Sequence, residues 1–146
     1  MKLLTDKIRE KLRKNVEQPD ADHFPAVKFF DPCGGATWLF TELGGDGDTL
    51  FGLCDLGMGF PELGCASLRE ISQTRGALGL PMERDRHFRA AAPLSVYAKA
   101  ARSAGGIVER GEHFDAALAR QAGQSAAPAG DEPDSRPPPG QPIPAN

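Results

Sequence analysis

Three short segments of alternating apolar and polar residues, joined by turn residues, limit the folds open to this 146-residue chain. They span residues 26–30, 36–43 and 50–56. The middle segment, ATWLFTEL, is rich in the β-branched and aromatic residues that favour strands. Residues 31–35 (DPCGG) and 44–48 (GGDGD) are turns of a length that joins antiparallel neighbours. The pattern predicts a three-stranded meander, with a short fourth strand at residues 64–67.

Helical patterns lie on both sides of this predicted sheet. The first carries an apolar stripe at helical spacing, made by Leu4, Ile8, Leu12 and Val16. Thr5 can cap this helix and Pro19 ends it. A capping box at residues 67–70 opens a second helix that runs to about residue 75, and Pro93 starts a third over residues 94–104. Helices beside a small antiparallel sheet give an α+β, two-layer domain.

Proline content separates the folded part of the chain from its C-terminal end. Seven of the thirteen prolines lie between residues 121 and 146, where Ile143 is the only side chain larger than alanine that favours burial. Such a segment cannot bury enough apolar surface to offset its ordering entropy. We therefore expect one domain over residues 1–104, a weakly helical extension over 105–122 and a disordered Pro-rich tail over 123–146. Within the domain, residues 80–88 are predicted to be extended or irregular.

The charges are unevenly distributed, although the net charge is only −3. Lys28 is the only cation between residues 18 and 68, against eight acids. Proteins dedicated to duplex DNA usually carry a dominant basic patch. The acidic middle of the chain therefore argues against that class.

The lack of a signal peptide or membrane span, together with the cysteine pattern, predicts a cytoplasmic protein. The charged N-terminus lacks the apolar core of a signal peptide, and no run of about 18 apolar residues that could span a membrane occurs. The three cysteines, Cys33, Cys54 and Cys65, form no Cys-x-x-Cys pair. We expect them to be free thiols in a reducing compartment.

Residues 51–64, FGLCDLGMGFPELG, are the most unusual stretch of the chain, and residues 55–64 form its loop. Asp55 and Glu62 offer hydrogen-bond acceptors, Phe60 offers an apolar contact, and the glycines allow close backbone approach. With Trp38 and Glu42 on the neighbouring strand, they form a candidate binding surface. The alternative interpretation is a bent strand connection in which the glycines occupy positions with positive φ.

An enzymatic alternative uses the same carboxylates. Asp55 and Glu62 can act as acid and base if their environments separate their pKa values, and His23 or His87 can complete a mixed nitrogen and oxygen metal site. The spacing requires no such site, and no nucleophile elbow or phosphate-binding loop occurs. The sequence therefore predicts no catalytic residue, cofactor or metal.

A third interpretation rests on a run of cations near an aromatic residue. Arg84, Arg86, His87 and Arg89 flank Phe88, a combination that can contact phosphate or stack on a base. Together with the basic first helix, this run is a candidate nucleic-acid contact. The alternative is a solvated loop.

Four stretches of the chain resemble one bacterial family. They are MKLLTDKIREKL, DHFPAVKFFDPCGGATWLFTEL, FGLCDLGMGFPELGCASLREI and LGLPMERDRHFRAAAPLSVYA. Over residues 1–101 the chain is similar to the family catalogued as domain of unknown function 2958, and CDLGMGFPELG is the most specific part. The resemblance implies a plasmid or an integrative element, near DNA-processing genes, and carries no activity or catalytic residues with it.

These observations favour a non-catalytic accessory protein of a mobile element that binds another macromolecule. The expected partner is a host or element-encoded protein, such as a DNA-processing or defence factor. Nucleic acid is the alternative partner, and the oligomeric state stays open because an edge strand can pair with a second copy.

Overall fold

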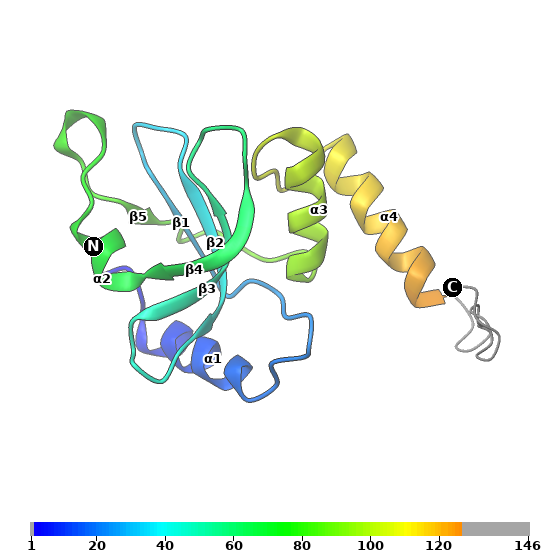
Figure 1. Ribbon diagram of the computed structural model, residues 1–146, viewed down its shortest axis with the longest axis horizontal. Coiled ribbons are helices and arrows are strands. Elements are labelled where there is room, and N and C mark those ends of the chain that lie inside the picture. The colour runs from blue at the N-terminus through cyan, green and yellow to red at the C-terminus, as the bar shows by residue number, and fades with distance from the viewer. Residues whose placement is uncertain (1, 127–146) are drawn as a thin grey trace.

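Five antiparallel strands form one sheet with helices on both faces. The computed structural model describes residues 2–126 (Figure 1). The strands are β1 (Val27–Phe30), β2 (Thr37–Leu43), β3 (Thr49–Asp55), β4 (Glu62–Ser67) and β5 (Glu83–Arg84), in the order β4-β3-β2-β1-β5. The helices are α1 (Asp6–Val16), α2 (Leu68–Gln73), the 3-10 turn η1 (Ala77–Gly79), α3 (Leu94–Ala104) and α4 (Glu112–Ala126). The predicted α+β class is confirmed.

Two hydrophobic cores lie on opposite faces of the sheet because strand residues alternate in direction. Trp38 and Phe40 of β2 pack in a core with Leu12 of α1. Leu39, which lies between them, packs in a second core with Tyr97 of α3. The prediction of two layers is therefore wrong: α1 covers one face and α3 the other.

Helix α1 is fixed to the sheet by a polar contact as well as by its apolar stripe. Thr5 caps it as predicted, since its hydroxyl accepts a hydrogen bond of 3.1 Å from the Ile8 amide. Asn15 is buried and donates a hydrogen bond of 2.8 Å to the carbonyl of Thr41. The register of β2 and β3 shifts between Phe40 and Glu42, so the Thr41 carbonyl lies at a bulge. Asn15 satisfies a backbone group that the bulge takes out of the ladder.

The backbones of β2 and β3 approach closely beside this bulge. Gly52 of β3 pairs with Phe40, and a Cβ atom at position 52 would lie 2.0 Å from the Leu39 carbonyl oxygen. It would also lie 2.7 Å from the Phe40 Cα. Only glycine fits at this position.

Helix α3 begins after Pro93 and ends at Gly105, which adopts φ 84° as a left-handed cap. Helix α4 packs on α3 through Tyr97 and Phe114, whose ring centroids are 5.1 Å apart. The prediction placed a weakly helical extension over residues 105–122, whereas α4 spans Glu112–Ala126. Within residues 2–126, none of the helices has the length and apolar content needed to cross a bilayer.

Two further predictions are revised by the strand and helix bounds. The sheet has five strands instead of three or four, because Glu83 and Arg84, in the segment predicted to be extended or irregular, pair with Phe30 and Phe29. Residues 123–126 belong to α4 and not to a disordered tail, and the rest of that predicted tail lies outside the described residues.

We expect Gly52→Ala to lower the free energy of unfolding by about 3 kcal/mol, because the added methyl group meets backbone that cannot move aside. Gly64→Ala is the matched control, since Gly64 is the cross-strand partner of Gly52 on β4 and a Cβ there meets nothing within 4 Å. It should change stability by less than about 0.5 kcal/mol. Urea unfolding of both variants measures the difference, and equal losses would contradict the close approach.

Candidate functional site

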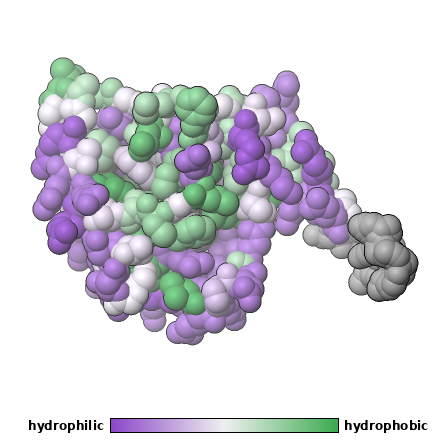
Figure 2. Space-filling view, viewed as in Figure 1, coloured by the Kyte–Doolittle hydropathy of each residue, from purple (hydrophilic) through white to green (hydrophobic). Residues whose placement is uncertain are grey.

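The loop between β3 and β4 carries a group of exposed apolar side chains. Four of the nine large apolar residues that are exposed among the described residues lie between positions 56 and 63. Their exposed fractions are 62% for Leu56, 73% for Met58, 79% for Phe60 and 46% for Leu63. Figure 2 shows hydrophobic residues gathered over β4 and this loop. We call residues 56–63 the apolar loop, and such a patch typically marks a site of interaction.

The backbone of the apolar loop is held by glycines. Gly57 and Gly59 have φ of 80° and 89°, a region that favours glycine. A Cβ at Gly57 would lie 3.0 Å from the carbonyl carbon of Gly35, in the turn between β1 and β2. The two turns therefore pack backbone against backbone, and the loop has a fixed support.

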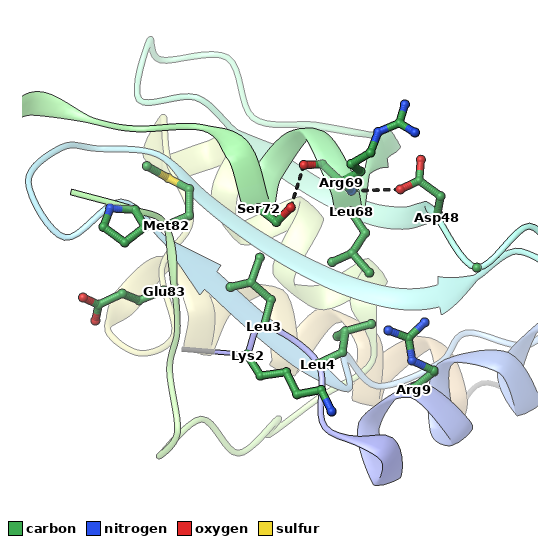
Figure 3. A pocket seen from close by; sticks show the side chains of 12 residues that line it. Lys2, Leu3, Leu4, Arg9, Asp48, Leu68, Arg69, Ser72, Met82 and Glu83 are labelled. Atoms are coloured by element: carbon green, nitrogen blue, oxygen red, sulfur yellow. Dashed lines mark hydrogen bonds between the residues drawn. The ribbon is translucent and has the colours of Figure 1, made fainter. Parts of the chain in front are cut away.

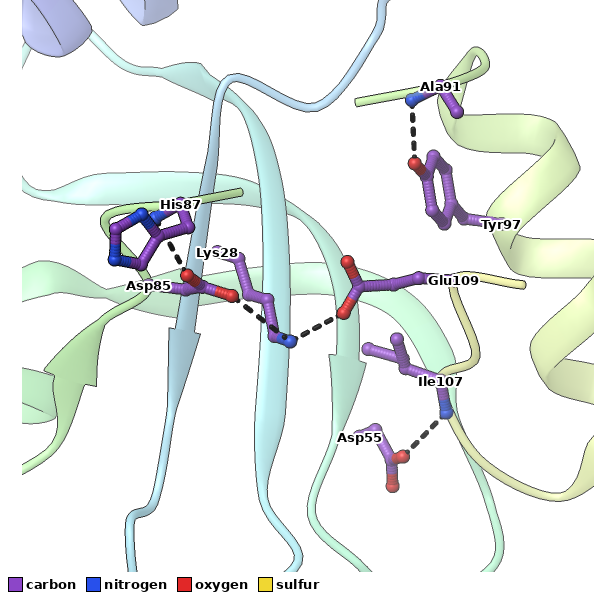
Figure 4. A network of polar contacts seen from close by, with 8 residues as sticks. All are labelled: Lys28, Asp55, Asp85, His87, Ala91, Tyr97, Ile107 and Glu109. Atoms are coloured by element: carbon purple, nitrogen blue, oxygen red, sulfur yellow. Dashed lines mark hydrogen bonds and ion pairs between the residues drawn. The ribbon is translucent and has the colours of Figure 1, made fainter. Parts of the chain in front are cut away.

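Asp55 anchors the base of the apolar loop. It is buried, and its two carboxylate oxygens accept hydrogen bonds from two backbone amides. The Gly57 amide donates at 2.8 Å. The Ile107 amide, in the connection between α3 and α4, donates at 2.9 Å, as Figure 4 shows. Asp55 thus ties the sheet to the α3–α4 connection, which is a structural role.

The structure brings together only some of the residues predicted for a binding surface. Phe60 and Glu62 are exposed on the loop and at the start of β4. Trp38 is only 7% exposed and belongs to the core beneath α1, so its assignment to a surface is corrected. Asp55 is buried as well, so its assignment to the surface is also wrong. Glu42 is half-buried and lies beyond the bulge, opposite Phe51. The end of β2 that pairs with Asp55, next to the apolar loop, is the other end of the strand.

The geometry does not favour an acid and base pair. Glu62 is the cross-strand partner of Cys54, so these two side chains share a face of the sheet. Asp55 follows Cys54 and is directed to the opposite face. His23 contacts the Gln18 carbonyl at 2.8 Å instead. No group of three potential ligands able to hold a metal ion occurs in the part of the chain that the structure describes.

Cys54 is not an activated thiol. Burial, with the neighbouring Cys65, raises the pKa of the Cys54 thiol to about 11, so it is protonated at neutral pH. Cys33 and Cys65 are exposed and, like Cys54, free of disulfides, as predicted.

Strand β4 forms an open edge of the sheet beside the apolar loop. It lies at the end of the strand order and in front of the other strands in Figure 1. The Leu68 amide donates to the Asp48 carbonyl at 2.9 Å, so Leu68 and Asp48 are a hydrogen-bonded pair. In an antiparallel ladder, hydrogen-bonded and non-hydrogen-bonded pairs alternate, and every second residue of β4 therefore points its backbone groups toward β3. Gly64 and Ala66 accordingly turn their backbone groups toward β3. Leu63 and Cys65 turn theirs to the open edge.

A cavity of about 590 Å³ lies next to this edge. Phe60, Pro61 and Leu63 line one side and Arg102 of α3 lines the other. The Arg102 side chain is exposed and makes no salt bridge among residues 2–126. The apolar loop, the β4 edge and this cavity form one continuous surface.

The cation run near β5 is only partly available for binding. Arg84 donates a hydrogen bond to the Lys2 carbonyl, which holds the run against the residues that precede α1. Arg86, His87 and Arg89 are exposed. Asp85, which pairs with Lys28, lies between Arg84 and these three residues, so an acid interrupts the run.

Lys28 is the centre of a polar network that the sequence analysis missed. Its Nζ lies 2.5 Å from a carboxylate oxygen of Glu109 and 3.5 Å from one of Asp85 (Figure 4). Nearby, the Tyr97 hydroxyl accepts a hydrogen bond of 2.9 Å from the Ala91 amide, and burial raises the pKa of Tyr97. The sequence feature that could have indicated this network is Lys28 itself, the only cation between residues 18 and 68. The network joins β1 to the connection between α3 and α4.

Comparison with protein families matches residues 3–108 to the family described as "Protein of unknown function (DUF2958)". The chain belongs to the DUF2958 family. The match covers the whole sheet and α1 to α3, and it ends before α4. Comparisons with curated proteins and with solved structures found no match. The apolar loop and the β4 edge therefore lie within the DUF2958 domain.

We expect Asp55→Ala to lower the free energy of unfolding by about 2 kcal/mol, because two part-buried amides lose their acceptor. Asp55→Asn should lose less, since its side chain keeps one acceptor oxygen. Glu62→Gln is the control at an exposed carboxylate and should change stability by less than about 0.5 kcal/mol. Urea unfolding distinguishes these outcomes, and an unchanged Asp55→Ala midpoint would refute the anchoring role.

Proposed function

We propose that this DUF2958 protein is a non-catalytic module that binds another protein by adding an extended segment of that partner to the open edge of β4. The observation that carries the proposal is the pairing of an open strand edge with four exposed apolar side chains at its start. Strand addition combines backbone hydrogen bonds, which supply affinity, with side-chain contacts, which supply specificity.

The β4 edge lacks the features that usually prevent strand addition. Proteins protect an edge with lysine, proline, bulges or a covering element. Strand β4 has the sequence ELGCAS, in which Glu62 is the only charged residue, and its pairing with β3 shows no register shift. The backbone groups of Leu63 and Cys65 are consequently available to a partner strand.

The apolar loop supplies the side-chain contacts. Burial of apolar surface is worth roughly 25 cal/mol per Å², and Met58 and Phe60 are more than 70% exposed in the free chain. Their backbone is already fixed by Asp55 and the Gly57–Gly35 contact, so little ordering entropy opposes binding. Phosphate contacts would need cations, and Arg102 is the one cation that lines this surface. A protein partner therefore suits it better than nucleic acid.

The biological setting belongs to the same proposal. The resemblance to the family implies a plasmid or integrative element, and an accessory protein there acts through host or element-encoded factors. A DNA-processing or defence factor is the class of partner we infer.

The test begins with affinity capture of the tagged full-length chain from a bacterial host, once with and once without nuclease. Mass spectrometry identifies the retained proteins, and ultraviolet absorbance reports retained nucleic acid. Binding of the purified partner is then measured for two variants. Phe60→Ser should weaken it by about tenfold or more, as loss of a buried aromatic anchor does. Cys65→Pro should abolish it, because proline removes the outward amide without breaking the β3 ladder.

Matched controls separate binding from folding. Cys65→Thr changes the same side chain but keeps the amide, and Leu118→Gln replaces an exposed apolar residue on α4. Both should bind as the original chain does. A partner that binds Cys65→Pro and Phe60→Ser normally would rule out the β4 edge, and retention of nucleic acid alone would rule out a protein partner.

A further inference from the structure

A second groove lies beyond the other end of β4 and involves different elements. It encloses about 600 Å³ between the residues before α1, helix α2 and the strand β5 (Figure 3). Leu4, Leu68 and Met82 line it together with Lys2, Arg9 and Arg69. The groove therefore combines an aliphatic floor with a cationic rim.

The floor of the groove is aliphatic throughout. Leu4 and Met82 are almost fully buried, at 2% and 5% exposure, and Leu68 is half-buried. No aromatic side chain lines the groove. Base stacking, on which the binding of single-stranded nucleic acid depends, is therefore not available here. Aliphatic side chains of a ligand fit such a floor.

The rim of the groove has cations on both sides. Lys2 and Arg9 lie on one side and Arg69 on the other (Figure 3). Both salt bridges of the described residues belong to Lys28, so none of the three rim cations is in a salt bridge there. Unpaired cations around an apolar floor are complementary to acidic groups on an apolar ligand.

The two acids that line the groove, Asp48 and Glu83, offset this rim only in part, because three cations against two acids leave a net charge of +1. Asp48 accepts hydrogen bonds from the Arg69 amide at 2.8 Å and the Ser67 hydroxyl at 2.7 Å. These bonds, together with the positive charge of Arg69, lower the pKa of the Asp48 carboxyl. Asp48 therefore offsets part of the Arg69 charge, whereas Lys2 and Arg9 lie on the other side of the groove (Figure 3). Glu83 lies at the end away from Arg9 (Figure 3).

We propose that this groove binds a short acidic peptide segment, with aliphatic side chains on the Leu4–Leu68–Met82 floor and carboxylates at Lys2, Arg9 and Arg69. The groove does not use the β4 edge, so this site and the edge can be occupied independently.

The proposal is tested by titrating the ¹⁵N-labelled full-length chain with a short capped peptide that alternates glutamate with leucine. Amide signals of Leu4, Leu68 and Met82 should shift. Arg9→Gln combined with Arg69→Gln should weaken binding by about tenfold. Lys7→Gln combined with Lys11→Gln is the matched control, because it removes the same charge from exposed positions on α1 outside the groove. It should weaken binding by less than about twofold.

Four outcomes would overturn the proposal. They are no shift at millimolar peptide, equal binding of a peptide with glutamine in place of glutamate, equal weakening in the two double variants, and displacement of the peptide from these amides by a single-stranded DNA oligonucleotide. The last would assign the groove to nucleic acid.

Discussion

The close approach of β2 and β3 at Gly52 is the contact on which the rest of the structure depends. Strand β2 contributes to both cores, through Phe40 on the α1 side and Leu39 on the α3 side, and β3 does the same through Leu50 and Leu53. Its register with β3 therefore positions both helices. The bulge that accompanies this approach leaves the Thr41 carbonyl to Asn15, so α1 is fixed by the same irregularity in the sheet.

The proposed binding surface follows from this arrangement because β3 continues into the apolar loop and β4. Asp55 ends β3 and holds the loop through two backbone amides, one of them from the α3–α4 connection. The loop is thus presented by a rigid scaffold with its apolar side chains in solvent. Exposure of such side chains has no benefit to the free chain, whereas burial against a partner is favourable.

Local pattern predicted the strands, the helix caps and the unusual loop, but not the contacts between distant segments. Trp38 was assigned to the surface because the alternation along residues 36–43 cannot show which face of the strand α1 covers. Asp55 was proposed as a site residue because its partner Ile107 lies far along the chain. Strand β5 is two residues long, too short to produce a period. The predicted meander implied the order of β1, β2 and β3, whereas the pairing of β4 with β3 and of β5 with β1 emerged only from the fold.

The measurement that tests the β4 edge most directly is amide hydrogen exchange of the chain with and without its captured partner. In the free chain, Gly64 and Ala66 should exchange slowly because they donate to β3, while Leu63 and Cys65 exchange rapidly. Binding should slow exchange at Leu63 and Cys65 and leave the other two unchanged. If Leu63 and Cys65 still exchange rapidly in a saturated complex, the partner does not add a strand to β4.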